Sequence, residues 1–264
     1  MEKLVDKIYF KGKREKLISE LREQGISELT LGAMSKIPRH LFVSPRLFAS
    51  SYLDKVLPIS KKPNWRKPLD FWRDKSSLSQ PRVIAKMTDR LKLESTDRVL
   101  EIGTATGYQA AVLSQLAGEV VTVDVFHDLC KAAKMRLDKL KIDNVNVLVA
   151  DGSIHFTEEE MFNKIIVTAS VPPTPRPHPL LKLLKPGGLA VMPLGGVAGE
   201  EFWCQMLSIR AVEDSFVIEE QEPGYTFVNL EGRGGWESFN RSMTHAFHGN
   251  FLEQLGGSTE LSFD

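Results

Sequence analysis

Cysteine is scarce in this chain of 264 residues, where Cys130 and Cys204 are the only two and lie far apart. Their spacing matches no metal-ligand pattern, so we expect two buried free thiols, which suit a reducing compartment. An excess of either charge is also lacking, because 34 Lys and Arg residues balance 34 Asp and Glu residues. The composition therefore implies no general electrostatic attraction to nucleic acid or to an anionic membrane.

Long apolar runs are missing as well, and no segment is apolar enough over sufficient length to span a bilayer. The stretch 1–7 is charged and has no apolar core of signal-peptide length, so we expect a cytoplasmic location. His245 and His248 have no acidic or cysteine partner close in sequence, which favours surface histidines over a metal site. The length and the 42% hydrophobic content are typical of a soluble globular protein built from one large domain or from a core domain with an added lobe.

The stretch Val99–Gly107 is the most informative part of the chain. An apolar run ends in Glu101-Ile102, and Gly103 and Gly107 follow, separated by two threonines and an alanine. Glycines at these positions allow a sharp bend and a close approach of ligand to backbone. Residues 108–113 then show a helical pattern. A strand, a glycine turn and a helix in this order predict the first unit of a nucleotide-binding α/β sheet.

The residues around the glycines narrow the choice among adenine-containing cofactors. A dinucleotide-binding turn would place glycine at positions 105 and 108, where this chain has Ala105 and Tyr108. Glu101 precedes Gly103 at the end of the strand, and a carboxylate there suits a cationic ligand better than a pyrophosphate. S-adenosylmethionine carries a sulfonium and an amino group and has no phosphate. The turn therefore favours S-adenosylmethionine.

Acidic residues end the next two predicted strands as well. Asp124 closes the strand 119–124 and lies 23 residues after Glu101, a spacing typical of the carboxylate that binds a ribose. Asp151, followed by Gly152, closes the strand 145–150 and is placed to accept from an adenine amino group. Ligands of open α/β sheets bind at the carboxyl ends of the strands. Three acids at this edge therefore predict one shared binding site.

The pattern beyond residue 97 predicts a doubly wound, mostly parallel, Rossmann-like α/β sheet. Further strands are expected at 163–169 and 189–193, with a short helix ending at 184–188 between them. An antiparallel pair at 202–209 and 215–219 closes the sheet. We divide the chain into a helical lobe (1–57), a basic aromatic loop (58–80), the α/β domain (81–236) and a tail (237–264).

The loop 58–80 combines prolines, tryptophans and six basic residues against two acidic ones. It is either a lid that contacts an acidic partner or an irregular surface loop, and the sequence does not separate the two. Pro81 fits the first turn of the following helix, for which Ser79 or Gln80 is the expected cap.

These segments together resemble the protein-L-isoaspartate O-methyltransferase family over about residues 21–236. The glycine turn is shared by many methyltransferases, whereas the Pro-Arg-x-x-Phe-Val and Ser-Gln-Pro pieces are more specific to this family. The matching segments are Gly25-Ile26, Ala33-Met34, Ile37–Val43, Leu57–Ile59, Ser79–Pro81, Arg98–Leu113, Asp151–Ser153, Ile165–Ala169, Leu184–Gly188 and Phe227–Leu230.

The resemblance implies a seven-stranded methyltransferase sheet with an N-terminal helical lobe and a C-terminal extension. It implies methylation of the free α-carboxylate of L-isoaspartyl residues, a protein-repair activity, with S-adenosyl-L-methionine as donor, S-adenosyl-L-homocysteine as product and no metal. By the same resemblance Ser79 is the catalytic residue, and Ser77, Leu78 and Ser79 bind the substrate. The residues implied to bind the cofactor are Glu101, Gly103, Thr104, Ala105, Thr106, Gly107, Tyr108, Asp124, Val125, Asp151 and Gly152.

The chain departs from the family pattern in three places, and the first lies where the family binds its peptide, so it concerns the identity of the substrate more than methyl transfer. Lys75–Leu78 differs from the usual lead into Ser79, and an insertion of roughly a dozen residues with Trp65 and Trp72 precedes it. Ala105 replaces the usual middle glycine, which a negative φ would allow. An extra tail follows Trp236. A carboxyl methyltransferase acting on another peptide or small-molecule carboxylate, and a non-catalytic module that binds the cofactor without turnover, both stay open as alternatives, and the sequence leaves the oligomeric state undetermined.

Overall fold

A computed structural model describes residues 2–59, 76–157, 161–174, 177–198, 201–213, 215–236 and 260–261. Most of the basic aromatic loop, including Trp65 and Trp72, lies outside these residues, as do His245 and His248 and nearly all of the tail. The boundaries of the four predicted regions stay predictions. In the described part of the chain, no helix is long and apolar enough to cross a membrane.

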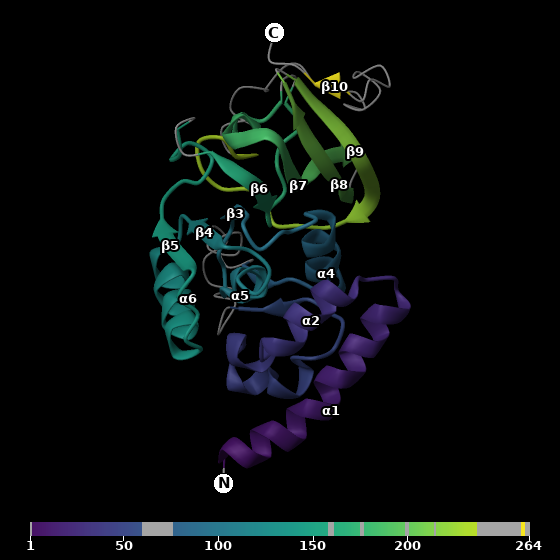
Figure 1. Ribbon diagram of the computed structural model, residues 1–264, viewed down its shortest axis with the longest axis vertical. Coiled ribbons are helices and arrows are strands. Elements are labelled where there is room, and N and C mark those ends of the chain that lie inside the picture. Colours follow the sequence, from purple (N-terminus) through teal and green to yellow (C-terminus); the bar gives the residue numbers. More distant parts are fainter. Residues whose placement is uncertain are drawn as a thin grey trace.

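One sheet of eight strands organises the fold, in the order β10-β9-β8-β7-β6-β3-β4-β5 (Figure 1). The strands from β3 to β7 are parallel, whereas β8, β9 and β10 run antiparallel to their neighbours. This confirms the doubly wound, mostly parallel prediction, to which the two-residue β10 adds an eighth strand. The strands of the sheet are β3 (Arg98–Ile102), β4 (Glu119–Asp124), β5 (Val145–Val149), β6 (Phe162–Val167), β7 (Leu184–Ala198), β8 (Glu201–Val212), β9 (Ser215–Tyr225) and β10 (Glu260–Leu261).

The order of the parallel strands reverses at β3, which pairs with β4 on one side and with β6 on the other. The carboxyl edge beside such a reversal is where open α/β sheets bind their ligands. Successive residues of β3 alternate between two faces of the sheet, and both faces are buried: Leu100 packs with the cluster around β6 and β7, and Val99 packs with the helices α4 and α5. Helices of the α/β part are α4 (Pro81–Arg90), α5 (Tyr108–Leu113) and α6 (His127–Lys139).

The N-terminal lobe lies at the opposite end of the molecule from the long antiparallel strands (Figure 1). Gly25, with φ +83°, follows the end of its first helix, and Ser27 caps the second by accepting from Thr30 N at 3.3 Å, both as the sequence indicates. A hydrophobic cluster joins this lobe to α5 through Tyr108, Ala111 and Val112. The lobe contains α1 (Glu2–Glu23), α2 (Glu28–Lys36) and the 3₁₀ helices η1 (Arg39–Phe42) and η2 (Pro45–Ser50).

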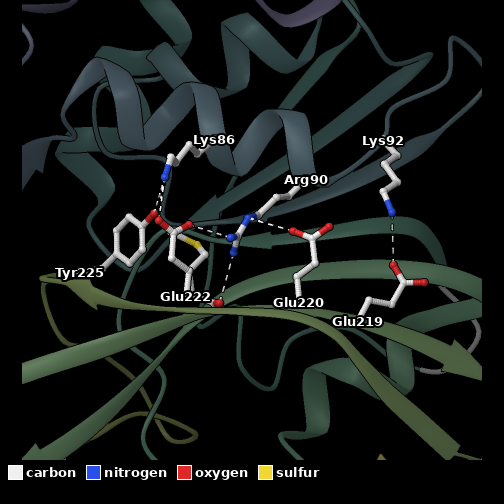
Figure 2. Close-up of polar contacts among 8 residues, drawn as sticks. Lys86, Arg90, Lys92, Glu219, Glu220, Glu222 and Tyr225 are labelled. Atoms are coloured by element: carbon white, nitrogen blue, oxygen red, sulfur yellow. Dashed lines mark hydrogen bonds and ion pairs between the residues drawn. The ribbon is translucent and has the colours of Figure 1, made fainter. Parts of the chain in front are cut away.

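A row of ion pairs joins α4, and the turn after it, to β9 (Figure 2). Glu222 accepts from Lys86 Nζ and from Arg90 Nη2, each at 2.7 Å. Arg90 also reaches Glu220, and a further pair joins Lys92 to Glu219 at 3.4 Å. These contacts fix the helix that begins directly after Ser79 and Gln80 to the outer strands of the sheet.

Two local expectations need correction. The helix expected to end at 184–188 is a 3₁₀ helix, η3 (Pro179–Leu183), and β7 already begins at Leu184. Gln80 occupies the N-cap position of α4, but neither its side chain nor that of Ser79 makes a capping hydrogen bond. Asp54, distant in sequence, accepts from Arg82 N and from Gln80 Nε2, each at 2.9 Å, so the Ser79 hydroxyl is not needed as a cap.

Candidate active site

The three predicted acids lie at one edge of the sheet. Glu101 is on β3 and Asp124 ends β4, which is paired directly beside it. Asp151 follows the end of β5, which in turn is paired with β4. Because these strands are parallel neighbours, their carboxyl ends meet. The predicted gathering of the three acids at the carboxyl edge of the sheet is therefore confirmed.

Glu101 is a fully buried carboxyl group. Neither of its oxygens has a hydrogen-bond partner in the described part of the chain. Burial raises its pKa to about 8; the nearby Thr122 hydroxyl lowers it and the charge of Asp124 raises it further. A buried carboxylate without partners is costly, and a cation bound beside it removes much of that cost. A positively charged group bound here would therefore be favoured.

Asp124 is held in place by two backbone amides. Ala105 N donates to Oδ2 at 2.9 Å and Phe126 N donates to Oδ1 at 3.1 Å. Burial raises the pKa of this carboxyl group, and these amides oppose the rise. Each carboxylate oxygen can accept a second hydrogen bond, so a fixed and half-buried Asp124 can receive two hydroxyl groups of a ligand.

The glycine turn has left-handed backbone at three places. Gly103 has φ +104°, and a Cβ on it would lie 2.3 Å from the Thr168 hydroxyl oxygen. Gly107 has φ +84° and caps α5, with Ala133 close behind it. Ala105 has φ +45°, so the negative φ at which alanine would fit this turn without strain is not met. The hydrogen bond from Ala105 N to Asp124 holds this strained conformation in place.

The other side chains of the turn point into protein rather than toward a ligand. The Thr104 hydroxyl bonds to the Thr122 hydroxyl at 2.7 Å, and the Thr106 hydroxyl accepts from Tyr108 N at 3.3 Å. The Tyr108 ring is 2% exposed and packs edge-on against Phe42 of the lobe. These side chains shape the turn, which leaves its backbone as the surface for a ligand.

Asp151 has a structural task that its position in the sequence does not reveal. Its Oδ1 accepts from Ser153 N at 3.1 Å, and its Oδ2 accepts from Arg233 N at 2.7 Å. Gly232 packs so closely that a Cβ on it would lie 2.3 Å from the carboxylate. The carboxylate therefore anchors the segment 231–235 at the edge of the sheet. Gly152 is buried against Val123 and Ile102.

Two other predicted residues differ in how accessible they are. Val125 is 37% exposed directly after Asp124, so it can border a ligand at this edge. Leu78 is buried in the lobe cluster, so its side chain is not free to contact a substrate.

Ser79 stands between the lobe and α4. The strand β2 (Ser77–Leu78) pairs antiparallel with β1 (Leu57–Pro58) and places it there. Its carbonyl oxygen accepts from Arg39 Nη2 at 2.7 Å, and its hydroxyl makes no hydrogen bond in the described part of the chain. A half-buried hydroxyl without a partner is available to a substrate.

Arg39 is the residue that sequence reasoning missed. It appears in the sequence only as part of the Pro-Arg-x-x-Phe-Val segment, and nothing local indicates that its charged side chain is fully buried. Its guanidinium carbon lies 4.9 Å from the centroid of the Tyr108 ring. One side chain thus contacts both the serine segment and the first residue of α5. Among the residues that the structure describes, no group of three potential metal ligands occurs.

The chain is similar in sequence to proteins of one family. The family model described as protein-L-isoaspartate(D-aspartate) O-methyltransferase matches residues 12–234. A protein-L-isoaspartate O-methyltransferase of Geobacter metallireducens is 38% identical over 219 residues, which cover 83% of this chain and 93% of the relative. One of the same name from Dictyoglomus thermophilum is 37% identical over 229 residues, covering 86% and 95%.

Solved structures give the same result. A protein-L-isoaspartate O-methyltransferase structure superposes with a TM-score of 0.71 at 26% identity, covering 90% of this chain and 72% of that one. A Plasmodium falciparum structure titled as this type of methyltransferase, in complex with S-adenosyl-L-homocysteine, has a TM-score of 0.63 at 18% identity. It covers 83% of this chain and 98% of that one, and it supports the fold.

Proposed function

Since this chain belongs to the protein-L-isoaspartate(D-aspartate) O-methyltransferase family and has S-adenosylmethionine-dependent protein-L-isoaspartate O-methyltransferase activity, we propose that Ser79 and the three edge acids carry it out. Ser79 orients the α-carboxylate of an isoaspartyl residue. Glu101, Asp124 and Asp151 line the cofactor site. The substrates are proteins or peptides that contain this damaged residue.

The residues at the edge fit S-adenosylmethionine. The two orphaned oxygens of Glu101 suit a ligand with cationic groups. Asp124, held by the amides of Ala105 and Phe126, would accept from the ribose hydroxyls, and the backbone of residues 103–107 would border the cofactor. Asp151 Oδ1 already accepts from both the amide and the hydroxyl of Ser153, and Oδ2 accepts from Arg233 N, so accepting from the adenine amino group would use the remaining lone pair of Oδ2.

The reaction asks the protein for position rather than for a strong base. When bound, S-adenosylmethionine supplies an electrophilic methyl group on a positively charged sulfur. A carboxylate is already nucleophilic, so the chain has to align one of its oxygens with that methyl group and exclude water. The Ser79 hydroxyl donates a hydrogen bond to the other carboxylate oxygen and holds the group in this orientation. No residue of the chain has to remove a proton.

The single observation that supports this assignment best is the buried, unpartnered carboxyl group of Glu101, with Asp124 fixed beside it at the edge of the sheet. A sheet that had only a structural purpose would satisfy those oxygens with its own donors.

Ser79→Ala tests the catalytic assignment. We expect turnover to fall about 10- to 100-fold, because a hydrogen bond to a charged group contributes about 1.5–3 kcal/mol. The assay follows labelled methyl transfer to an isoaspartyl peptide, and calorimetric titration with S-adenosylhomocysteine reports on the cofactor site. Affinity for S-adenosylhomocysteine should stay within about threefold of the original. Ser35→Ala, on α2, is the matched control because its hydroxyl bonds only to its own helix at Gly32 O.

Two results would contradict the role given to Ser79: unchanged turnover in Ser79→Ala, or loss of S-adenosylhomocysteine binding by this variant. A matched peptide with ordinary aspartate separates the substrate alternatives, since equal methylation of both peptides would indicate a carboxyl methyltransferase with a different preference.

A further inference from the structure

Arg39 connects three segments that are far apart in the sequence. Its Nε donates to Ser51 O at 2.9 Å in the lobe, and its Nη2 donates to Ser79 O at 2.7 Å. Its guanidinium also lies over the Tyr108 ring, at the junction of the glycine turn and α5. The side chain is fully buried, so water does not compete for these contacts. The serine segment and the cofactor turn are therefore fixed relative to each other through one guanidinium.

The charge of Arg39 is not balanced by an ion pair in the described part of the chain. Its Nη1 is buried without a hydrogen-bond partner. Asp54 acts on it only through space, since that carboxylate already accepts from Gln80 and Arg82 N. Burial lowers the pKa of the guanidinium and Tyr108 opposes this, but an arginine stays charged. A buried positive charge without an ion-pair partner is costly, and an anion bound nearby reduces that cost.

We propose that Arg39 is a positioning residue for methyl transfer, which holds Ser79 in register with the cofactor turn and attracts the substrate carboxylate with its unpaired charge. This inference rests on the role proposed for Ser79 above. Arg39 is buried and is not assigned a direct contact with the substrate. Its hydrogen bond to Ser79 O positions the serine segment and so affects turnover, whereas its charge acts through space and so affects binding of the anionic substrate.

Arginine is the residue that suits both purposes. Its planar fork donates to two carbonyl oxygens while its face lies on an aromatic ring. A lysine at this position keeps the charge but donates from a single nitrogen, so it cannot hold Ser51 O and Ser79 O in the same geometry. A glutamine keeps one donor group and loses the charge. The two substitutions therefore separate the two effects.

The experiment compares Arg39→Lys and Arg39→Gln, each alone and combined with Ser79→Ala. Turnover and KM are measured with an isoaspartyl peptide, and calorimetric titration with S-adenosylhomocysteine reports on folding and on the cofactor site. Arg98→Lys is the matched control, because Arg98 also lies over an aromatic ring, Phe162, at 4.5 Å, but at the amino end of β3. It should leave both constants within about twofold.

We expect both substitutions to lower turnover about tenfold, and Arg39→Gln to raise the peptide KM several-fold more than Arg39→Lys does. Affinity for S-adenosylhomocysteine should change less than about threefold. In the Ser79→Ala background, Arg39→Lys should lower turnover by less than about twofold further, because its effect passes through Ser79. A purely structural role would instead give independent losses that multiply.

Unchanged kinetics in Arg39→Lys, or losses that multiply with those of Ser79→Ala, would overturn the inference. If Arg39→Gln fails to bind S-adenosylhomocysteine, Arg39→Lys and its combination with Ser79→Ala decide the question. Different results would refute the two proposals. Unchanged turnover in Ser79→Ala refutes the proposed function. Lowered turnover in Ser79→Ala together with unchanged turnover and KM in Arg39→Lys refutes this inference alone.

Discussion

In the absence of ligand, the stability of Glu101→Gln relative to the wild-type protein should increase as the pH rises. The wild-type carboxyl group has a pKa of about 8 in the folded protein, against an ordinary value of 4.5. Below pH 4.5 it is protonated in both the folded and the unfolded chain. Between pH 4.5 and 8 only the unfolded chain ionises, so the folded wild-type protein loses stability over this window. Glutamine stays neutral and does not incur this loss.

The size of the effect follows from the rise in pKa. A change from 4.5 to about 8, at about 1.4 kcal/mol for each pKa unit, corresponds to about 5 kcal/mol at pH 8 and above. The free energies of unfolding of the mutant and the wild-type protein should therefore diverge by about 1.4 kcal/mol per pH unit between pH 5 and 8. Any constant cost of the amide group cancels in this slope.

Urea unfolding at pH 5, 6, 7 and 8 without ligand measures the slope, with Glu94→Gln, at an exposed position, as the control.

The same proteins test the link to ligand binding. If the ionised carboxyl group is the binding form, affinity for S-adenosylhomocysteine should rise about tenfold between pH 7 and 9 in the wild-type protein and not in Glu101→Gln. A pH-independent difference in stability between the two proteins would refute the argument, since it would mean that Glu101 is already ionised when folded.

Three further substitutions test the surroundings of the site. Ala105→Gly should raise the free energy of unfolding by about 1 kcal/mol in urea titrations, because Ala105 has φ +45°. An unchanged or lower free energy of unfolding would show that the conformation is not strained. Gly232→Ala should cost more than about 2 kcal/mol and weaken S-adenosylhomocysteine binding in calorimetry, since a Cβ would collide with Asp151 at a φ of +105°. Glu222→Gln should cost about 1 kcal/mol in low salt and less in high salt, because it breaks the half-exposed pairs with Lys86 and Arg90. Burial alone would raise the pKa of Glu222, but the hydrogen bonds and charges of its partners lower it overall. The contribution of Glu222 to stability is therefore present above the ordinary carboxyl pKa and should fade as the pH drops through the lowered value, which low-pH unfolding measures.

Several features of the site depend on contacts between segments that are distant in the sequence. Ala105 has φ +45°, and its amide donates to Asp124 on the next strand. Asp54, and not the expected Ser79, accepts a hydrogen bond from the first turn of α4, at Arg82 N. The Tyr108 side chain packs against Phe42 of the lobe. Each outcome depends on where another part of the chain folds back.

The sequence by itself determined the succession of the main strands along the chain, the glycine turn and the three acids at the carboxyl edge. Apolar periodicity and glycine placement are local properties, and parallel strands bring their carboxyl ends together whatever the details of packing. Only the tertiary structure decided which polar groups are satisfied. It left the oxygens of Glu101 without partners, engaged those of Asp151 with the segment 231–235, and buried Arg39 between the lobe and Ser79. Burial and hydrogen bonding of this kind depend on residues far apart in the chain, and no local pattern records them.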